Sequence, residues 1–179
     1  MTDNVISAEN QQERLDKEKL GYFLAGFVEG EGSFNVSLRK RPSYRSRWQV
    51  VPKFNVSQKD PTLLRILMKE LNCGAVRIRK RDGLYFFEVT NPSDLLSKVI
   101  PYFKRFSLRS KSKIKNFTVF CEIVDLITLN KLPINLLTLR KVVELREILN
   151  KGIGRKRKYT ISDILPYLES PQTTRQTLV

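Results

Sequence analysis

Histidine is absent from the 179-residue sequence and cysteine occurs only twice, which excludes several common kinds of site. Without histidine there is no imidazole base, no histidine metal ligand and no serine-histidine-aspartate triad. Cys73 and Cys121 are too few and too far apart for a disulfide framework or a zinc site, and we expect both to be buried hydrophobic residues. Any catalysis must therefore use carboxylates, lysine and a metal ion.

Long apolar stretches are also missing, because no run approaches the roughly 20 residues that span a bilayer. The first residues carry Asp3, Glu9 and Glu13 and resemble neither a signal peptide nor a transit peptide, so we expect no import signal. The length is typical of one domain. We expect a disordered lead-in over residues 1–14, one folded domain over 15–168 and a disordered tail over 169–179.

Acidic residues are scarce relative to basic ones. Asp and Glu number 18 against 33 Lys and Arg, which gives a net charge of +15 and an isoelectric point near 10. Such an excess attracts a polyanion before any contact is specific. Nucleic acid is the partner that this balance favours, although ribosomal and membrane-surface proteins are also basic. We therefore expect a nucleic acid as partner, and neither a membrane nor a small-molecule substrate.

The periodic part of the sequence starts with a helix and continues with two strand-strand-helix units. Each unit has two strands of alternating polarity before a helix that an Asp-Pro or Asn-Pro pair begins. The order α-ββα-ββα predicts an α+β saddle, in which four antiparallel strands offer one polar face and helices cover the other. The predicted strands cover residues 34–41, 48–57, 75–81 and 84–90. The predicted helices cover residues 17–30, 61–72, 92–103, 113–129, 135–150 and 162–168.

The first helix ends in Glu29-Gly30-Glu31-Gly32, a short spacing of acids and glycines. Metal-dependent cleavage of a phosphodiester needs carboxylate oxygens that are held rigidly, and the end of a helix can hold them. The alternative is that both acids are simply solvated. A carboxylate at a helix C-terminus opposes the macrodipole by roughly 0.3–1 kcal/mol, however, which favours a compensating cation. We therefore predict a metal site at Glu31.

Gly26 and Gly30 lie four residues apart on this helix, with Ala25 beside them. Two such helices can cross with their backbones nearly touching, which would bring two Glu31 carboxylates together. The alternative is that the glycines pack against a strand of the same chain. Because the chain holds one copy of the segment, we predict a homodimer with Ala25, Gly26 and Gly30 in its interface.

The segment Leu24-Ala25-Gly26-Phe27-Val28-Glu29-Gly30-Glu31-Gly32 resembles the signature of the LAGLIDADG homing endonucleases, with glutamates in place of aspartates. The ββα units extend the resemblance over about residues 17–150, and the single copy resembles the homodimeric branch. The resemblance implies double-strand DNA cleavage at a long, roughly palindromic site by Mg²⁺-dependent hydrolysis, with short 3′ overhangs and with Mn²⁺ as a second candidate metal. It also suggests an intron-borne gene in an organelle, mitochondrion or chloroplast, or in a microbe.

The resemblance assigns roles to single residues. The second acid of the motif, Glu31 here, binds the metal, and Gly30 lends its carbonyl. Gln58 stands where family members position the active-site water, whereas Thr62 replaces a basic residue that the family usually carries. The catalytic lysine of the family falls within residues 108–113. Of these residues, Lys111 is the first candidate and Lys113 the second.

The polar strand faces are the expected DNA contacts. Arginine recognises guanine, and Asn or Gln adenine, in the major groove, each good bidentate pair being worth about 1–3 kcal/mol. A merely solvated face is the alternative, but it would usually be diluted with acids. The expected contacts are Asn35, Ser37, Arg39, Arg41, Arg47, Gln49, Lys53, Asn55, Arg77 and Arg79. The basic run over residues 155–158 is interpreted as a solvated loop or a phosphate contact.

Two other functions remain open. One is an RNA-binding maturase that assists intron splicing, and the other is a DNA-binding protein that has lost cleavage. The acid at Glu31 favours the nuclease, while Thr62 keeps the inactive binder open.

Overall fold

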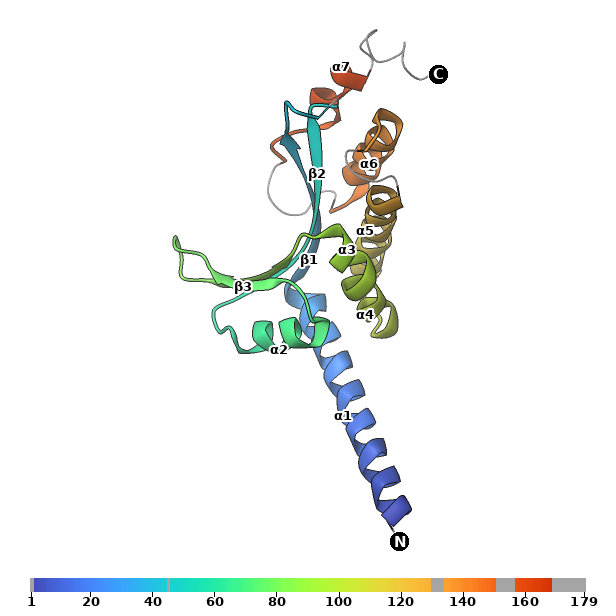
Figure 1. Ribbon diagram of the computed structural model, residues 1–179. Coiled ribbons are helices and arrows are strands. Elements are labelled where there is room, and N and C mark those ends of the chain that lie inside the picture. Colours follow the sequence, from blue (N-terminus) through green and yellow to red (C-terminus); the bar gives the residue numbers. More distant parts are fainter. Residues whose placement is uncertain (1, 45, 130–133, 151–156, 169–179) are drawn as a thin grey trace.

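Two antiparallel hairpins form the sheet on which the molecule is built (Figure 1). The strand order is β1-β2-β4-β3, and helices α3 to α6 cover one face of the sheet. The computed structural model describes residues 2–44, 46–129, 134–150 and 157–168. The strands are β1 Gly32–Lys40, β2 Trp48–Gln58, β3 Ala75–Ile78 and β4 Tyr85–Val89. The helices are α1 Thr2–Glu31, α2 Thr62–Leu71, α3 Pro92–Asp94, η1 Leu95–Val99, α4 Ile100–Arg105, α5 Lys111–Leu129, α6 Leu136–Ile148, η2 Ile161–Asp163 and α7 Leu165–Leu168.

The α+β saddle predicted from the sequence is confirmed. Strand β1 alternates buried and accessible residues along its length, as does the second half of β2. The apolar side therefore packs under the helices, and the polar side forms the opposite face. β1 pairs with β2 from Gly32↔Val56 to Lys40↔Trp48, so the two longest strands run side by side over nine residue pairs. The third and fourth strands are shorter than expected, and their hairpin curls away from the helices (Figure 1).

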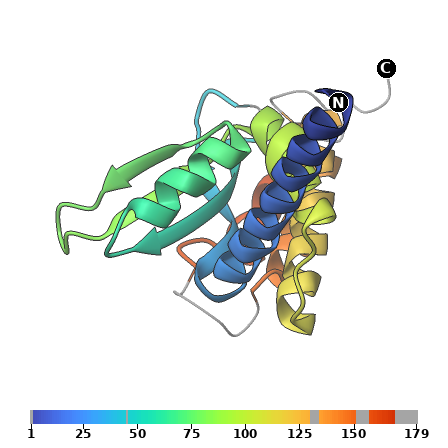
Figure 2. The ribbon, with the colours of Figure 1, turned by 90° about the horizontal axis from the view of Figure 1, so that it is seen from below.

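Helix α1 is much longer than the sequence indicated. We expected residues 1–14 to be disordered, but the helix begins at Thr2 and projects well beyond the sheet (Figure 1), and in the view from below it lies across the front of the molecule (Figure 2). Residues 10–19 are exposed, so no core holds this part. Local pairs support it instead: Lys17 Nζ lies 2.6 Å from a Glu13 carboxylate oxygen, and Gln12 donates to Asp16 at 3.0 Å. The stretch also lacks glycine and proline, which removes the usual helix breakers. The predicted tail at 169–179 lies outside the described residues.

The helix expected over residues 92–103 is divided into α3, a π-helical turn η1, and α4. Pro101 explains the division, because it has no N–H to donate to the carbonyl four residues earlier. The N–H of Ile100 bonds to the carbonyl of Leu95, five residues back, which is the π-helical spacing. Among the described residues, no helix is long and apolar enough to cross a membrane.

The core between sheet and helices is a cluster of phenylalanine rings around Phe34, which is 1% exposed. Phe54 stacks on it at 5.2 Å between ring centroids, and Phe117 and Phe120 of α5 approach to 5.0 and 5.3 Å. Phe103 meets it edge-on at 5.8 Å. The rings therefore join the sheet to α4 and α5, and through them hold the start of α5 near the end of α1.

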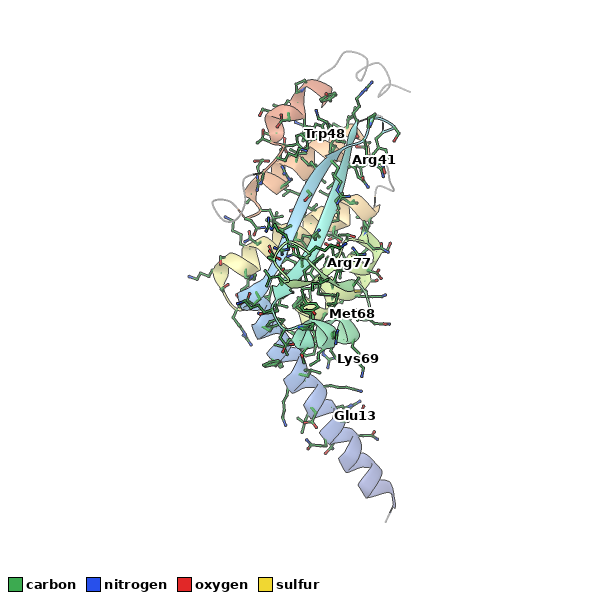
Figure 3. All side chains as sticks on the ribbon, turned by 90° about the vertical axis from the view of Figure 1, so that its left-hand side faces the viewer. Glu13, Arg41, Trp48, Met68, Lys69 and Arg77 are labelled. Carbon is green, nitrogen blue, oxygen red and sulfur yellow. The ribbon has the colours of Figure 1, made fainter. Side chains whose placement is uncertain are left out.

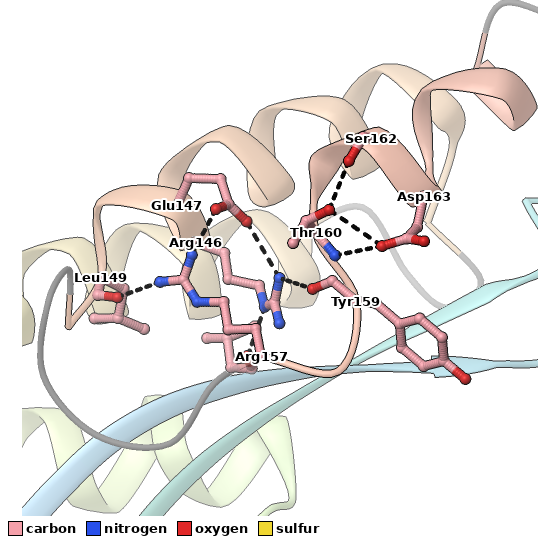
Figure 4. A network of polar contacts seen from close by, with 9 residues as sticks. Arg146, Glu147, Leu149, Arg157, Tyr159, Thr160, Ser162 and Asp163 are labelled. Atoms are coloured by element: carbon pink, nitrogen blue, oxygen red, sulfur yellow. Dashed lines mark hydrogen bonds and ion pairs between the residues drawn. The ribbon is translucent and has the colours of Figure 1, made fainter.

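A buried arginine fastens the C-terminal part of the chain to the sheet (Figure 4). Arg146 is 4% exposed, and it donates to the carbonyl of Val36 at 2.8 Å and to that of Tyr159 at 2.9 Å. Burial lowers the pKa of its guanidinium, and nearby Arg157 lowers it further, whereas Glu147 opposes both. Glu147 also pairs with Arg157 at 2.7 Å. This network brings residues 157–160 to the margin of the polar sheet face.

We expect Phe34→Ala to lower the free energy of unfolding by about 3–5 kcal/mol, because it removes a buried ring that four other rings contact. Urea unfolding followed by circular dichroism measures the loss. Leu137→Ala is the matched control, since Leu137 is 70% exposed and its truncation should change stability little. An equal loss in the two variants would contradict this account of the core.

Candidate functional site

The site forms where α1 ends and the chain turns directly into β1. Gly32 makes this turn possible, because a Cβ there would lie 2.5 Å from a methyl group of Val28 and 2.7 Å from its carbonyl oxygen. Gly30 and Glu31, just before the turn, are exposed, whereas Val28 is fully buried. The last turn of α1 is thus anchored in the core on one side and presents Glu31 to solvent on the other.

Glu31 borders a hollow between α1, the end of β2 and the start of α2. Among the described residues, none makes a hydrogen bond or an ion pair with its carboxylate, which leaves both oxygens free for a ligand. Asp60, by contrast, is engaged, because it accepts a hydrogen bond from the Thr62 N–H at 2.7 Å at the start of α2. The hollow is lined by Gly26, Phe27, Gly30, Glu31, Gln58, Asp60, Thr62 and Leu63.

The structure brings Gln58 and Thr62 to the same hollow as Glu31, as the sequence predicted for Gln58. Gln58 is the last residue of β2 and pairs with Tyr85 of β4. The side chain at Thr62 is uncharged, and Arg65, one turn later, is exposed and does not line the hollow. No basic residue in this part of the described chain therefore substitutes for the one that the family pattern would place at Thr62.

The two candidate lysines differ clearly in position. Lys111 is exposed, whereas Lys113 is half-buried and donates through Nζ to the carbonyl of Gly32 at 2.6 Å. Burial lowers the pKa of Lys113, and the negative charges of Glu29 and Glu31 act against this shift. The geometry therefore favours the second candidate of the sequence, Lys113, over the first.

Glu29 is held differently from Glu31, although only one residue separates them. Its carboxylate accepts from the backbone N–H groups of Arg109 at 2.8 Å and Ser110 at 3.1 Å, and from the Ser110 hydroxyl. Burial by itself raises the pKa of Glu29, but these hydrogen bonds and the charge of Lys113 outweigh it, so the pKa is lowered overall. Glu29 is thus an ionised acceptor at the start of α5 and is not free for another ligand.

The donor set of one chain fits a hard cation but is incomplete. The Glu31 carboxylate and the Gly30 carbonyl at the helix end are oxygen donors of the type that Mg²⁺ prefers. Within the described ranges, no group of three acidic or cysteine side chains lies close enough to bind a metal by itself. A complete site therefore needs oxygen ligands from outside this chain, such as phosphate, water or a second Glu31.

The outward face of α1 carries Gly26 and Gly30 with open space around them. A Cβ at either position would meet no atom within 4 Å, so nothing within the described chain requires glycine there. Phe23, one turn earlier, is 56% exposed. Ala25 was expected in the same surface, but it is 4% exposed and packs inside its own chain, so that prediction is wrong. A helical residue next to Gly26 points about 100° away from it, which explains the difference.

The polar face of the sheet is hollowed and mostly basic. Figure 3 looks onto it and shows Arg77 near its middle and Arg41 towards the far end of β1 and β2. Arg39 and Gln49 oppose each other in the β1–β2 register, as do Asn35 and Lys53. Arg41 and Arg47 lie at the hairpin tip, where Arg41 donates to Gln49 at 3.2 Å. Of the expected contacts, those that line the hollow are Asn35, Ser37, Arg39, Lys53, Asn55 and Arg79.

Several residues of this face escaped the sequence analysis. Glu88 of β4 pairs with Lys53 at 2.6 Å and with Arg77 at 3.2 Å, so an acid lies among the predicted contacts. Asn150 donates to the carbonyl of Phe34 at 2.7 Å and borders the same hollow. The alternation of β4 indicates that Glu88 points to the polar side, but no pattern in the sequence places Asn150 near β1.

The C-terminal basic run also reaches this face in part. Arg157, Lys158 and Tyr159 line the hollow beside β1, which fits the interpretation as a phosphate contact better than that as a remote solvated loop. Residues 155 and 156 lie outside the described part of the chain.

The two cysteines, expected to be buried, are only half-buried, with the pKa of Cys121 raised by burial to about 11.

Comparison with known protein families gives one match, to the family described as LAGLIDADG endonuclease, over residues 24–124. The match runs from the motif helix to the buried part of α5 and covers more than half of the sequence. The chain belongs to the LAGLIDADG endonuclease family.

Relatives with similar sequence and structure are named as endonucleases. A probable intron-encoded endonuclease 2 of Neurospora crassa is 30% identical over 147 residues, which are 80% of this chain and 32% of that protein. DNA endonuclease I-CeuI of Chlamydomonas moewusii is 32% identical over 58% of this chain and 50% of its own. The chain thus spans about a third to a half of the length of these curated relatives.

A solved LAGLIDADG structure matches over nearly its whole length. The archaeal intron-encoded homing endonuclease I-Vdi141I, complexed with DNA, superposes with a TM-score of 0.75 at 26% identity. The match covers 86% of this chain and 96% of that one. The fold is therefore shared over most of this chain and nearly all of that one.

The ionised state of the first motif acid should make stability depend on pH. Because the pKa of Glu29 is below its ordinary value of 4.5, its contribution to stability is present above that value and is lost as the pH falls through the lowered pKa. We expect Glu29→Gln to lower the free energy of unfolding at neutral pH by about 1 kcal/mol. The difference from the unmodified protein should shrink below pH 4.5. Urea unfolding at a series of pH values measures it, and a constant difference would contradict the assignment.

Proposed function

We propose that this protein is a homing endonuclease that cuts both strands of DNA by metal-dependent hydrolysis at a long, roughly palindromic site. The observation that carries the proposal is that the half-buried ammonium of Lys113 bonds to the carbonyl of Gly32, the residue next to Glu31, whose carboxylate has no hydrogen bond or ion pair among the described residues. Both groups lie at one end of a basic saddle. Relatives named as endonucleases, and one solved with DNA, support the same function.

Each residue of the site has a task in hydrolysis. The Glu31 carboxylate and the Gly30 carbonyl would hold Mg²⁺, or Mn²⁺, which polarises the scissile phosphate and lowers the pKa of a bound water. Lys113 places a positive charge where negative charge develops on the phosphate. Gln58, which lines the same hollow, can accept a hydrogen bond from the attacking water through its amide oxygen or donate one to it through its amide nitrogen. With no histidine in the chain, the proton must leave through water or a carboxylate.

The saddle supplies the DNA interface. Its accessible face combines Arg39, Lys53, Arg77 and Arg79 with the amides of Asn35 and Asn55, the residue types that contact phosphates and recognise base edges. Asn35 already donates to Asn55 at 2.9 Å. A base that either amide recognises would replace this hydrogen bond with one to the DNA. Arg157 and Lys158 extend the positive charge along one margin.

A second copy of the chain completes the enzyme on this proposal. One chain has one motif and one Glu31, and its described residues hold no group of three acidic or cysteine side chains for a metal, while Gly26 and Gly30 leave an open strip on α1. Two α1 helices that cross at this strip would bring the two sites together, one for each DNA strand. The names of the relatives further support an intron-borne gene, in an organellar or microbial genome.

The test is cleavage of a randomised duplex library with and without Mg²⁺, with the cut ends sequenced. We expect metal-dependent double-strand cuts at one roughly palindromic site. We expect Glu31→Gln to lower the cleavage rate at least about 100-fold while DNA binding persists, because the amide keeps the shape but loses the charged metal ligand. Glu18→Gln is the control, as it changes an acid of the same helix whose side chain is 54% exposed.

Other outcomes separate the remaining functions. Specific binding to duplex DNA without cutting in any metal would indicate a DNA-binding protein that has lost cleavage. Preferential binding to the folded intron RNA, with splicing stimulated and Glu31→Gln without effect, would indicate a maturase. Cleavage by Glu31→Gln at the normal rate would refute the metal site proposed here.

Gly26→Ala tests the dimer. In a monomer the change should be harmless or stabilising by about 1 kcal/mol, because alanine favours helix and its Cβ meets no atom of the described chain. Between two crossing helices the same methyl groups would separate the backbones, so we expect the sedimenting species to shift from dimer to monomer at micromolar concentration. A variant that sediments as the unmodified protein does would contradict a dimer through this strip.

A further inference from the structure

Glu29, the first acid of the motif, has no part in the proposed metal chemistry, yet it links two elements. It accepts hydrogen bonds from Arg109 and Ser110, which immediately precede α5. At a helix start the N–H groups have no partner within the helix, and an anion there is favoured by the macrodipole. The end of α1 is thereby joined to the beginning of α5.

A second contact, three residues further along on each side, joins the first residue of β1 to the first turn of α5. Lys113 Nζ donates to the carbonyl of Gly32 at 2.6 Å. The links from Glu29 to Ser110 and from Gly32 to Lys113 both connect residues 81 positions apart. The Ser110 hydroxyl oxygen also accepts from the Lys113 N–H at 3.3 Å and so caps the turn that carries the lysine. Glu31 lies between Glu29 and Gly32, the two residues that these contacts hold against α5 and the residues before it.

Apolar packing holds α5 on either side of its first turn, but the first turn itself buries no side chain. Leu108, just before the helix, is 5% exposed, and Phe117 within the helix packs against Phe34. Lys111, the residue at which the helix begins, is exposed, and Lys113 is half-buried. Polar contacts therefore orient the Lys113 ammonium within this turn, and apart from its own bond to Gly32 the contacts described for this turn lead to Glu29.

We propose that Glu29 is the positioning residue for Lys113: it fixes the start of α5 against the end of α1, so that the ammonium lies beside the Glu31 carboxylate. The inference rests on the proposed nuclease function and deepens it. Glu29 acts through Ser110 and the α5 backbone, and touches neither metal nor DNA. It thus has a task different from that of Glu31, although both are acids of one motif.

The test is a double-mutant cycle with Glu29→Ala and Lys113→Ala, measured as the single-turnover cleavage rate at saturating protein. We expect Glu29→Ala to lower the rate about 100-fold, the effect of a displacement of about 1 Å at a catalytic group, with the Kd for target DNA in metal-free buffer unchanged. The double variant should cut no more slowly than Lys113→Ala alone, because Glu29 acts only through the lysine. Glu29→Gln, which keeps one acceptor oxygen, should recover part of the rate.

Controls separate positioning from a general loss of structure. Glu18→Ala removes an exposed acid of the same helix and should leave rate and Kd as they are. Thermal unfolding must show that each variant is folded at the assay temperature. Equal losses of cleavage and DNA binding in Glu29→Ala would indicate a purely structural role. If the cleavage rate of the double variant falls by the product of the two single losses, Glu29 acts independently of Lys113. Either result overturns the proposal.

A second measurement does not depend on cleavage. In ¹⁵N spectra selective for lysine ammonium groups, the Lys113 signal should persist in the unmodified protein and in Glu18→Ala, because its bond to Gly32 slows exchange. It should be lost in Glu29→Ala, and an unchanged signal would overturn the proposal. If no DNA is cut at all, or if Glu31→Gln cuts normally, the proposed function fails, and this spectrum still decides whether Glu29 places Lys113.

Discussion

The direct turn from α1 into β1 is the constraint on which the site depends. Val28 is buried, Gly32 leaves no room for a side chain, and the chain between them has only one way to continue into the sheet. Glu31 lies within this turn, so its position follows from the packing of the helix and from the register of β1 with β2. The phenylalanine cluster around Phe34 then holds α5 against the same place. The site is as rigid as the core because it begins at the edge of the core.

Electrostatics organises the rest of the molecule around that turn. The chain has a net charge of +15, and basic side chains line the accessible face of the sheet and its C-terminal margin, where a polyanion can be held before it is recognised. Acids appear only in specific places within this field. Glu88 holds Lys53 and Arg77 in fixed positions, Glu29 holds the start of α5, and Glu31 alone of these three is free of protein partners in the described chain. Because acids are few in this basic protein, the contacts of each acid indicate its separate task.

Much of the fold followed from local rules. Alternating polarity predicted all four strands, and proline, asparagine and glycine punctuation predicted where helices begin and end. Two of the errors have local causes of a different kind. Helix α1 begins at Thr2 rather than near residue 17, and its exposed residues 10–19 carry local side-chain pairs but no apolar stripe that signals a helix. Ala25 was grouped with Gly26 because they adjoin in sequence, whereas neighbouring helical positions face different directions.

The sequence alone determined the chemistry: no histidine, one motif with Glu31 at a helix end, and basic polar faces on predicted strands. These are properties of residue type and short spacing, which a linear chain displays directly. Only the tertiary structure favours Lys113 over Lys111 by its position, ties Glu29 to Ser110, and brings Asn150, Arg157 and Glu88 to one face. Each of these depends on contacts between segments far apart in the chain, and periodicity carries no information about which distant backbone atom a side chain will meet.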